Sequence, residues 1–263
     1  MVRCVEREMK FALRFAVLIT SLAAEGRPAE AQTTNEIQFK TSDQLTVFGD
    51  FHASAKVPAR AVLIVVHQGD GSARGDYGPI IPRLIREGFD VLAIDSRSGG
   101  ELFGSTNRTV SKNPARDWEY CDAYPDLTAA LDYAKTLRPA RPIIVWGSSY
   151  SATLALRLAA DRASELTAVL AFSPASGPSM GECQPVPYAA RVKIPALVVR
   201  PRGELDVAMR RADFDAFSKQ GHQTYIAEPS AHGSSVLVAE RANGDASATW
   251  ITVLAFLDRV LGK

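Results

Sequence analysis

Hydrophobic residues occur in short continuous runs along the chain, and segments with hydrophobic residues at helical spacing separate these runs. A short continuous run is typical of a strand that is buried on both faces of a parallel sheet. The helical segments are indicated by their spacing, and one of them ends at Gly88, a common residue at the end of a helix. The pattern predicts buried strands at residues 61–67, 89–97, 142–147, 166–174, 194–201 and 223–229. It predicts helices at residues 77–88, 126–137, 151–163, 212–221 and 247–262.

The segment before the first buried strand has a different pattern. In residues 36–41 and 45–53, β-branched and aromatic residues alternate with polar ones, which indicates an antiparallel pair of strands. After this pair, strands and helices alternate, which implies a mostly parallel sheet with helices on both faces. No repeat or low-complexity linker interrupts the alternation. We therefore expect one α/β domain over residues 32–263.

The N-terminus, residues 1–31, has the pattern of a secretory signal peptide. Lys10 and Arg14 supply a basic start, FAVLITSLAA supplies the apolar stretch, and Ala-Glu-Ala at residues 29–31 resembles a cleavage site. The apolar stretch is shorter than the roughly 20 residues that a membrane span needs. We expect a mature protein that is periplasmic or secreted. Met9 is an alternative start, and a disordered cytosolic leader is the alternative interpretation of the segment.

Composition and charge exclude several classes of function. The chain has 263 residues, of which 46% are hydrophobic, so it is long enough to bury a full core. Its 30 basic and 29 acidic residues give a formal net charge of +1, and no basic tract is present. Nothing in this balance predicts a nucleic-acid partner or an anionic membrane surface.

Export of the chain would change how its cysteines are interpreted. Removal of the signal leaves Cys121 and Cys183, an even number in an oxidising compartment. They can form one disulfide or remain two unrelated thiols. The sequence has no CxxC or HExxH spacing and only four histidines, so it predicts no metal site.

The candidate chemistry begins where the strand at residues 142–147 changes directly into a helix. Gly147, Ser149 and Ser151 fit the pattern G-x-S-x-small, in which a sharp strand-to-helix turn exposes a nucleophilic serine at the carboxyl edge of the sheet. The start of the helix also favours developing negative charge. The pattern predicts Ser149 as a nucleophile. Small residues also occur in ordinary strand-to-helix turns, so the serine needs a base and an acid to support it.

His232 is the candidate base, because it follows the last predicted strand and a loop there reaches the carboxyl edge of the sheet. A third group must orient the imidazole, and the loop after residue 201 offers Glu204 and, as an alternative, Asp206. The order serine, acid, histidine along the chain is the one used by hydrolases with this turn. We expect the other three histidines, His52, His67 and His222, to be structural.

These residues resemble the α/β-hydrolase superfamily, and more narrowly the small dienelactone-hydrolase-like esterases, over nearly all of the mature length. In many members the acid follows a strand-initial proline by nine positions and a valine follows three later; here these are Pro195, Glu204 and Val207. The resemblance favours Glu204, although the segment GELD keeps Asp206 as an alternative. It also implies an oxyanion hole made of the backbone amides of Tyr150 and Gln68.

The predicted reaction is hydrolysis of a small carboxylic ester by water through an acyl-serine, with no cofactor. Dienelactone hydrolases use a cysteine nucleophile, so a serine at position 149 disfavours a dienelactone as the substrate. Few residues lie between the strands at 166–174 and 194–201, which predicts no large lid. Tyr77, Trp146 and Tyr150 are either pocket aromatics or core residues. The alternatives are an amidase or peptidase, and a binding protein on the same fold without catalysis.

Overall fold

We describe the protein from a computed structural model, which describes residues 34–114 and 116–262. The described residues belong to one compact unit, Gln32–Lys263. The segment predicted to be a signal peptide lies outside the described residues.

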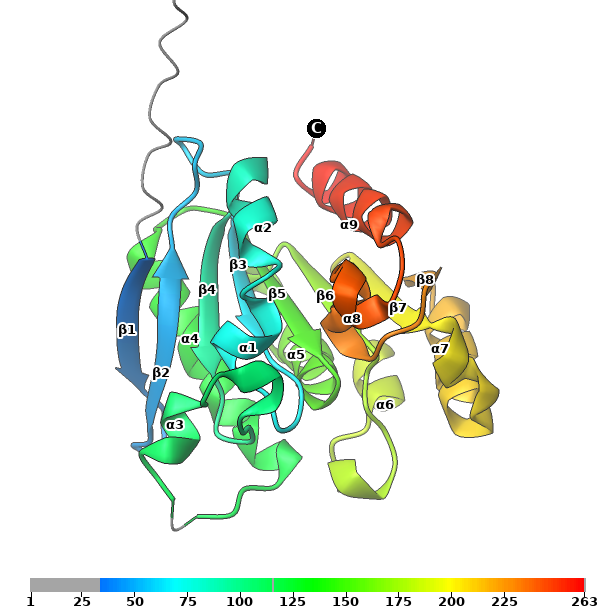
Figure 1. The fold of residues 1–263 in the computed structure, drawn as a ribbon, viewed down its shortest axis with the longest axis horizontal. Helices are drawn as coiled ribbons and strands as arrows, with labels where there is room; N and C mark the ends of the chain where they lie inside the picture. Colours follow the sequence, from blue (N-terminus) through cyan, green and yellow to red (C-terminus); the bar gives the residue numbers. More distant parts are fainter. Residues whose placement is uncertain (1–33, 115, 263) are drawn as a thin grey trace, which may run out of the picture. The chain divides into compact units, whose positions relative to one another are not determined.

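Eight strands form one sheet in the order β1-β2-β4-β3-β5-β6-β7-β8 (Figure 1). Strands β1 and β2 form an antiparallel hairpin, and β2 pairs antiparallel with β4, whereas β3 to β8 all pair parallel. The mostly parallel sheet expected from the sequence is therefore confirmed. The strands are β1 Thr34–Lys40, β2 Thr46–His52, β3 Val62–Val66, β4 Asp90–Asp95, β5 Ile143–Ser148, β6 Ala168–Phe172, β7 Ala196–Pro201 and β8 Gln223–Ala227.

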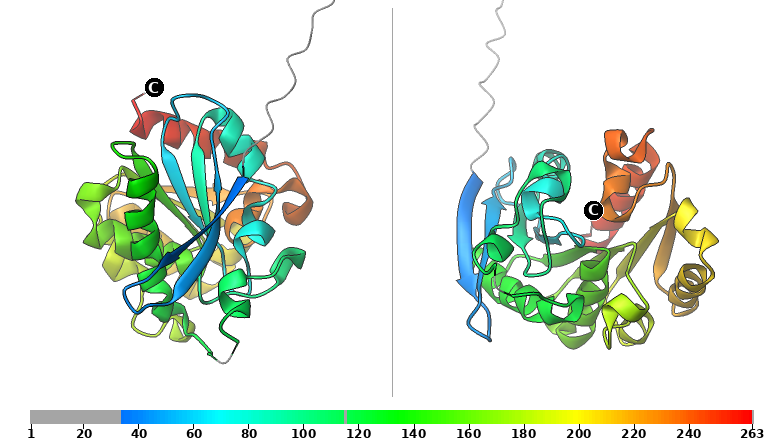
Figure 2. Two further views of the ribbon diagram at one scale, coloured as in Figure 1. Left: turned by 90° about the vertical axis from the view of Figure 1, so that its left-hand side faces the viewer. Right: turned by 60° about the horizontal axis from the view of Figure 1, so that its bottom comes forward.

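Helices cover both faces of the sheet, and a separate hydrophobic core lies under each layer (Figure 2). Helices α4, α5 and α7 contribute to one core, and α1, α2 and α9 lie on the other face. The central strands β3 to β6 are buried on both faces, as their continuous hydrophobic runs predict. The α-helices are α1 Ala73–Tyr77, α2 Ile81–Glu87, α3 Arg108–Ser111, α4 Tyr124–Leu137, α5 Tyr150–Asp161, α6 Pro185–Ala189, α7 Ala208–Lys219, α8 Ala239–Ala242 and α9 Ser247–Val260.

Short 3₁₀ helices occupy several of the connections. They are η1 Leu102–Gly104, η2 Tyr120–Ala123, η3 Ala163–Glu165, η4 Pro178–Met180, η5 Arg202–Asp206 and η6 Gly233–Leu237. Three of them, η2, η5 and η6, carry or adjoin predicted site residues. No large lid lies among the described residues, because the connection between β6 and β7 holds only η4 and α6.

The helix predicted over residues 77–88 is wrong at its start, because Tyr77 ends a separate short helix. Ser72 caps α1 by accepting the N–H of Gly75, and the second helix, α2, begins at Ile81. A proline in the first turn of α2 has no N–H to leave unpaired, which favours a new start there. The predicted end is correct, since Gly88 adopts a left-handed conformation with φ 98° just after α2.

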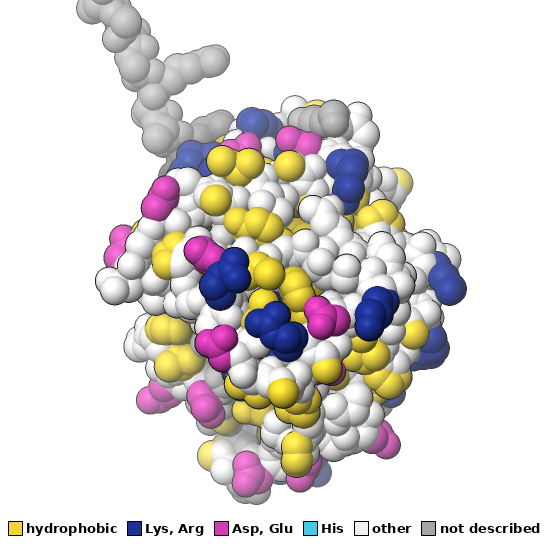
Figure 3. Space-filling model, turned by 90° about the vertical axis from the view of Figure 1, so that its right-hand side faces the viewer, with side chains coloured by type: hydrophobic (Ala, Val, Ile, Leu, Met, Phe, Trp, Pro, Cys, Tyr) yellow, Lys and Arg dark blue, Asp and Glu magenta, His cyan; other side chains and the backbone are white. Residues whose placement is uncertain are grey.

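The face that carries α7 and the outer edge of the sheet shows acidic, basic and hydrophobic side chains side by side (Figure 3). Charges of both signs surround a small hydrophobic patch, in keeping with the nearly balanced composition. None of the helices in the described part of the chain combines the length and hydropathy needed to cross a membrane.

Candidate active site

Ser149 stands alone in the turn between β5 and α5, with φ 63° and ψ −120°. A non-glycine residue at positive φ is strained, and such strain is concentrated at functional sites. The serine N–H donates to Phe172 O at 2.8 Å, which fixes the turn against β6. A side chain on Gly147 would overlap the backbone of Ser151, so the glycine two places before Ser149 is required by space.

Ser151 shows why a small polar residue follows the turn. Its Oγ accepts the N–H of Ser148 at 2.8 Å and lies 2.8 Å from Val66 O, the last residue of β3. The side chain therefore joins the turn to the neighbouring strand while remaining completely buried. The predicted spacing of small residues around Ser149 has a packing reason on each side.

His232 forms a hydrogen bond with Glu204, in which Nδ1 lies 2.5 Å from Oε1. Glu204 lies in η5 and is 8% exposed, whereas Asp206 at the end of the same 3₁₀ helix is exposed. Of the two acids that the sequence offered, the structure brings Glu204 to the histidine. With the carboxylate ionised, Nδ1 carries the proton and Nε2 is left as the acceptor.

Both oxygens of the Glu204 carboxylate accept hydrogen bonds. Ser173 Oγ donates to Oε1 at 2.9 Å, and Arg200 donates from a guanidinium nitrogen to Oε2 at 2.7 Å. Burial raises the pKa of Glu204, but hydrogen bonding and charge from His232, together with Arg200 and Ser173, outweigh burial and hold the pKa below its ordinary value. The carboxylate is therefore ionised at neutral pH.

The loop that carries the histidine packs directly on the turn that carries the serine. Ser234 N–H donates to Ser148 Oγ at 3.0 Å, and Gly233 N–H donates to Ser173 Oγ at 3.0 Å. Gly233 has φ 60°, and a side chain there would overlap Ser148 Oγ. These contacts hold the loop of His232, whose side chain is 47% exposed, against the residue that precedes the partly exposed Ser149.

The two predicted oxyanion amides differ. Tyr150 begins α5, and its N–H has no hydrogen-bond partner among the described residues. The N–H of Gln68, in contrast, donates to Asp76 Oδ2 at 2.7 Å. The assignment of Gln68 as an oxyanion donor is therefore not supported by this geometry, because its amide is already occupied. The next amide, that of Gly69, is without a partner in the described part of the chain.

Asp76 accounts for the difference at Gln68. Its carboxyl group is almost completely buried, and burial raises its pKa, a shift that nearby His67 and the Gln68 amide oppose. This interaction was not predictable from the sequence, because Asp76 lies eight residues away on a short helix that the hydrophobic pattern does not predict. The buried carboxyl group of Asp76 is the acceptor that occupies the amide at position 68.

A cavity of about 690 Å³ lies beside Tyr120. Its walls include Asp70, Trp118 and Tyr120, and the Tyr120 ring stacks on Tyr150 with centroids 4.7 Å apart. The Tyr120 hydroxyl also lies where a side chain on Gly69 would be. Tyr120 therefore lines the cavity and also contacts the Tyr150 ring and the Gly69 backbone, whereas Ser149, His232 and Glu204 are not among the described residues that line the cavity. The aromatic residues that the sequence considered for a pocket, Tyr77, Trp146 and Tyr150, are all completely buried in the core.

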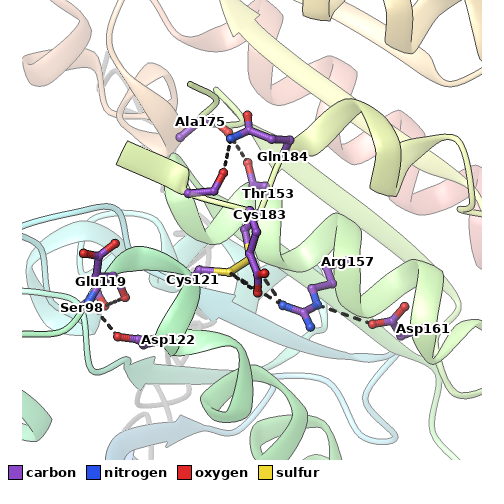
Figure 4. The surroundings of a disulfide bond; sticks show 12 residues. Ser98, Glu119, Cys121, Asp122, Thr153, Arg157, Asp161, Ala175, Cys183 and Gln184 are labelled. Atoms are coloured by element: carbon purple, nitrogen blue, oxygen red, sulfur yellow. Dashed lines mark hydrogen bonds and ion pairs between the residues drawn. A yellow bond between two sulfur atoms is a disulfide. The ribbon is translucent and has the colours of Figure 1, made fainter. Parts of the chain in front are cut away.

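A disulfide joins Cys121, in η2, to Cys183, in the loop after η4 (Figure 4). The two cysteines that the sequence left as a bridge or as separate thiols are thus bonded. Arg157 of α5 lies beside the sulfur atoms and 3.7 Å from Asp161. Because Tyr120 precedes Cys121 and η4 contributes to the cavity, the bridge connects two walls of the cavity.

The other histidines have structural partners. His67 is completely buried, and its Nε2 accepts the N–H of Ser96 at 2.9 Å. His52 contacts Thr34 Oγ1, and His222 contacts the carbonyl of Ala189. No group of three or more potential metal ligands occurs within residues 34–114 and 116–262.

Comparison with known proteins places the chain in a family. The family model described as serine aminopeptidase, S33, matches residues 57–220. A search of curated proteins finds no match. The match to this model leaves the narrower dienelactone-hydrolase-like assignment as a prediction.

Solved structures share the fold at low sequence identity. A Pyrococcus furiosus esterase is 18% identical, with 88% of this chain and 92% of that chain covered and a TM-score of 0.68. A thermostable carboxyl esterase from Bacillus coagulans is 13% identical, with 87% and 99% covered and a TM-score of 0.68. Pyrococcus horikoshii acylaminoacyl peptidase is 16% identical with a TM-score of 0.66, and the match covers 88% of this chain but 42% of the peptidase. The chain therefore belongs to the serine aminopeptidase S33 family, a family of serine hydrolases with the α/β-hydrolase fold.

Proposed function

We propose that the protein hydrolyses small carboxylic esters, with Ser149 as nucleophile, His232 as general base and Glu204 as the acid that orients His232. The observation that carries this proposal is the 2.5 Å hydrogen bond from His232 Nδ1 to a buried carboxylate, on a loop that packs against the strained serine turn. The bond leaves Nε2 free to accept a proton. A serine hydroxyl needs such a base at neutral pH.

The reaction proceeds in two half-reactions. Ser149 Oγ attacks the ester carbonyl carbon while its proton passes to His232 Nε2, and the alcohol then leaves with that proton. Water next attacks the acyl-serine, gives one proton to His232, and the carboxylic acid is released as Oγ regains its proton. The N–H groups of Tyr150 and Gly69 stabilise the oxyanion in both steps. Glu204 stays ionised and stabilises the imidazolium that forms each time.

The cavity beside Tyr120 supports a small substrate. Its volume of about 690 Å³ is within the usual range for small-molecule sites. Esters are the favoured substrates because a Pyrococcus furiosus esterase and a Bacillus coagulans carboxyl esterase share this fold. Peptide hydrolysis is the second candidate, because the matching family is described as an aminopeptidase and one neighbour is an acylaminoacyl peptidase.

Hydrolysis kinetics test the proposal and separate the two candidates. We would compare p-nitrophenyl acetate with an alanine p-nitroanilide, using wild type and Ser149→Ala. We expect ester hydrolysis that Ser149→Ala loses and a much lower kcat/KM for the anilide. Higher kcat/KM for the anilide would favour the peptidase. Folded wild type that hydrolyses neither compound would favour a binding protein.

Export is part of the proposal. The disulfide between Cys121 and Cys183 supports it, because such bonds are rare in reducing compartments. Expression of the full chain in a bacterial host should give a periplasmic protein whose N-terminus begins at Gln32. An uncleaved cytosolic product would contradict export without affecting the catalytic proposal.

A further inference from the structure

A buried arginine shares the carboxylate that holds His232. Arg200 is the fifth residue of β7, and its side chain is 2% exposed. One guanidinium nitrogen donates to Glu204 Oε2 at 2.7 Å, and another donates to the carbonyl of Pro174 at 2.6 Å. The arginine thus connects the end of β7 to the loop after β6. Arg200 contacts Glu204, which in turn contacts His232, the predicted base.

The two oxygens of the Glu204 carboxylate have different hydrogen-bond partners. Oε1 accepts hydrogen bonds from His232 and Ser173, and Oε2 accepts one from Arg200. A carboxylate held at one oxygen only can rotate about its side-chain torsion, and the imidazole bonded to it can turn with it. We propose that Arg200 is a positioning residue that fixes the Glu204 carboxylate and whose charge opposes protonation of His232. This inference rests on the proposed function, in which unprotonated His232 is the base.

The electrostatic part follows from the sign of the charge. A buried guanidinium stays protonated, so it places a permanent positive charge beside the acid. Burial lowers the pKa of Arg200, and Glu204 opposes that shift. The positive charge offsets part of the attraction that Glu204 exerts on an imidazolium. Without Arg200, His232 would therefore take up a proton at higher pH, and the active form would be lost earlier as the pH falls.

Other charged groups act on these residues from the neighbouring elements. Asp213 and Arg210, both on α7, interact with Arg200 with opposite signs. Asp76, on α1, interacts with His232 from the other side of the site. None of the three makes a hydrogen bond to Glu204 in the described part of the chain. Arg200 is thus the permanently charged group that contacts Glu204 among the described residues.

The test uses Arg200→Met, which removes the charge, and Arg200→Lys, which keeps it. Arg202→Met is the matched control, because Arg202 lies two residues later and forms an exposed ion pair with Glu228. For each protein we would measure the pH profile of kcat/KM for p-nitrophenyl acetate and, by NMR, the titration of the His232 imidazole.

We expect Arg200→Met to move the acid limb and the imidazole titration to higher pH by about one unit. Its kcat should fall about 10-fold to 100-fold, because the carboxylate is no longer fixed. Arg200→Lys should keep the acid limb of the pH profile at the wild-type pH but have a lower kcat than wild type. The ammonium group lacks the planar fork with which the guanidinium reaches both Glu204 and Pro174. Arg202→Met should match wild type in both measurements.

A merely structural arginine would give a different result. Arg200→Met that folds and keeps both the wild-type pH limb and the wild-type imidazole titration would overturn the proposal. If Arg200→Met does not fold, Arg200→Lys decides it, and wild-type kcat in that variant would overturn the positioning role. If wild type hydrolyses no ester, the proposed function fails, while the imidazole titration still tests the effect of the charge.

Discussion

Removal of the bridge between Cys121 and Cys183 should destabilise the protein strongly. The bond closes a loop between residues 62 positions apart. In the chain-entropy model a loop of this length stabilises the folded state by about 4 kcal/mol, as an upper value. For a domain of this size that corresponds to a fall in Tm of about 8–16 °C. Cys121→Ala/Cys183→Ala is the variant, because removal of both residues leaves neither of them as an unpaired thiol.

Urea unfolding followed by circular dichroism measures the change in the free energy of unfolding. Wild type should lose stability when dithiothreitol is added, and the double variant should be equally unstable with and without it. The double variant should also show a raised KM, because the bond joins the walls that carry Tyr120 and Pro178. Equal midpoints for oxidised wild type, reduced wild type and the double variant would refute this reasoning.

Three further predictions concern the acid and the histidine loop. Glu204→Gln should lower kcat for ester hydrolysis about 10⁴-fold, as removal of a triad acid does elsewhere, while the isosteric control Asp206→Asn should leave kcat unchanged. The reverse result would assign the role of the acid to Asp206. Gly233→Ala should cost about 1–3 kcal/mol in urea unfolding, because the new methyl group overlaps Ser148 Oγ, and wild-type stability would mean that the loop shifts freely. The lowered pKa of Glu204 contributes stability that is complete above the unfolded pKa of 4.5 and is lost as the pH falls through the lower folded pKa. Glu204→Gln should therefore flatten the profile of unfolding free energy below about pH 5, and a profile parallel to that of wild type would contradict this.

The fold could be predicted from the sequence because its central strands are buried on both faces. Runs such as residues 61–67 and 142–147 are short and rich in β-branched residues, which favours strands over buried helices, and helices must then cover both faces of the sheet. The separate helix α1 was missed, since five residues are too few to show a helical period. The connection between β4 and α4, where the hydrophobic pattern predicts neither strand nor helix, contains η1, α3 and η2, whose formation depends on caps and long-range contacts.

The candidate site was predictable only where local geometry dictates residue type. The turn around Ser149 excludes large neighbours, so its pattern is visible in the sequence. Glu204 and Asp206 lie on one 3₁₀ helix, and only the fold determines which of them faces His232. The occupied amide of Gln68 depends on Asp76, whose approach no local pattern encodes. One feature of the sequence points to Arg200, because it is a charged residue inside an otherwise hydrophobic strand, four residues before Glu204.

The central claim is that Ser149 forms a covalent intermediate, and intact-mass measurement after treatment with a fluorophosphonate tests it most directly. Wild type should gain the mass of one adduct, and Ser149→Ala should gain none. Glu204→Gln should label more slowly than wild type, while Asp206→Asn should label at the wild-type rate. Folded wild type that gains no adduct, or Ser149→Ala that labels as fast as wild type, would contradict the assignment of Ser149 as the nucleophile.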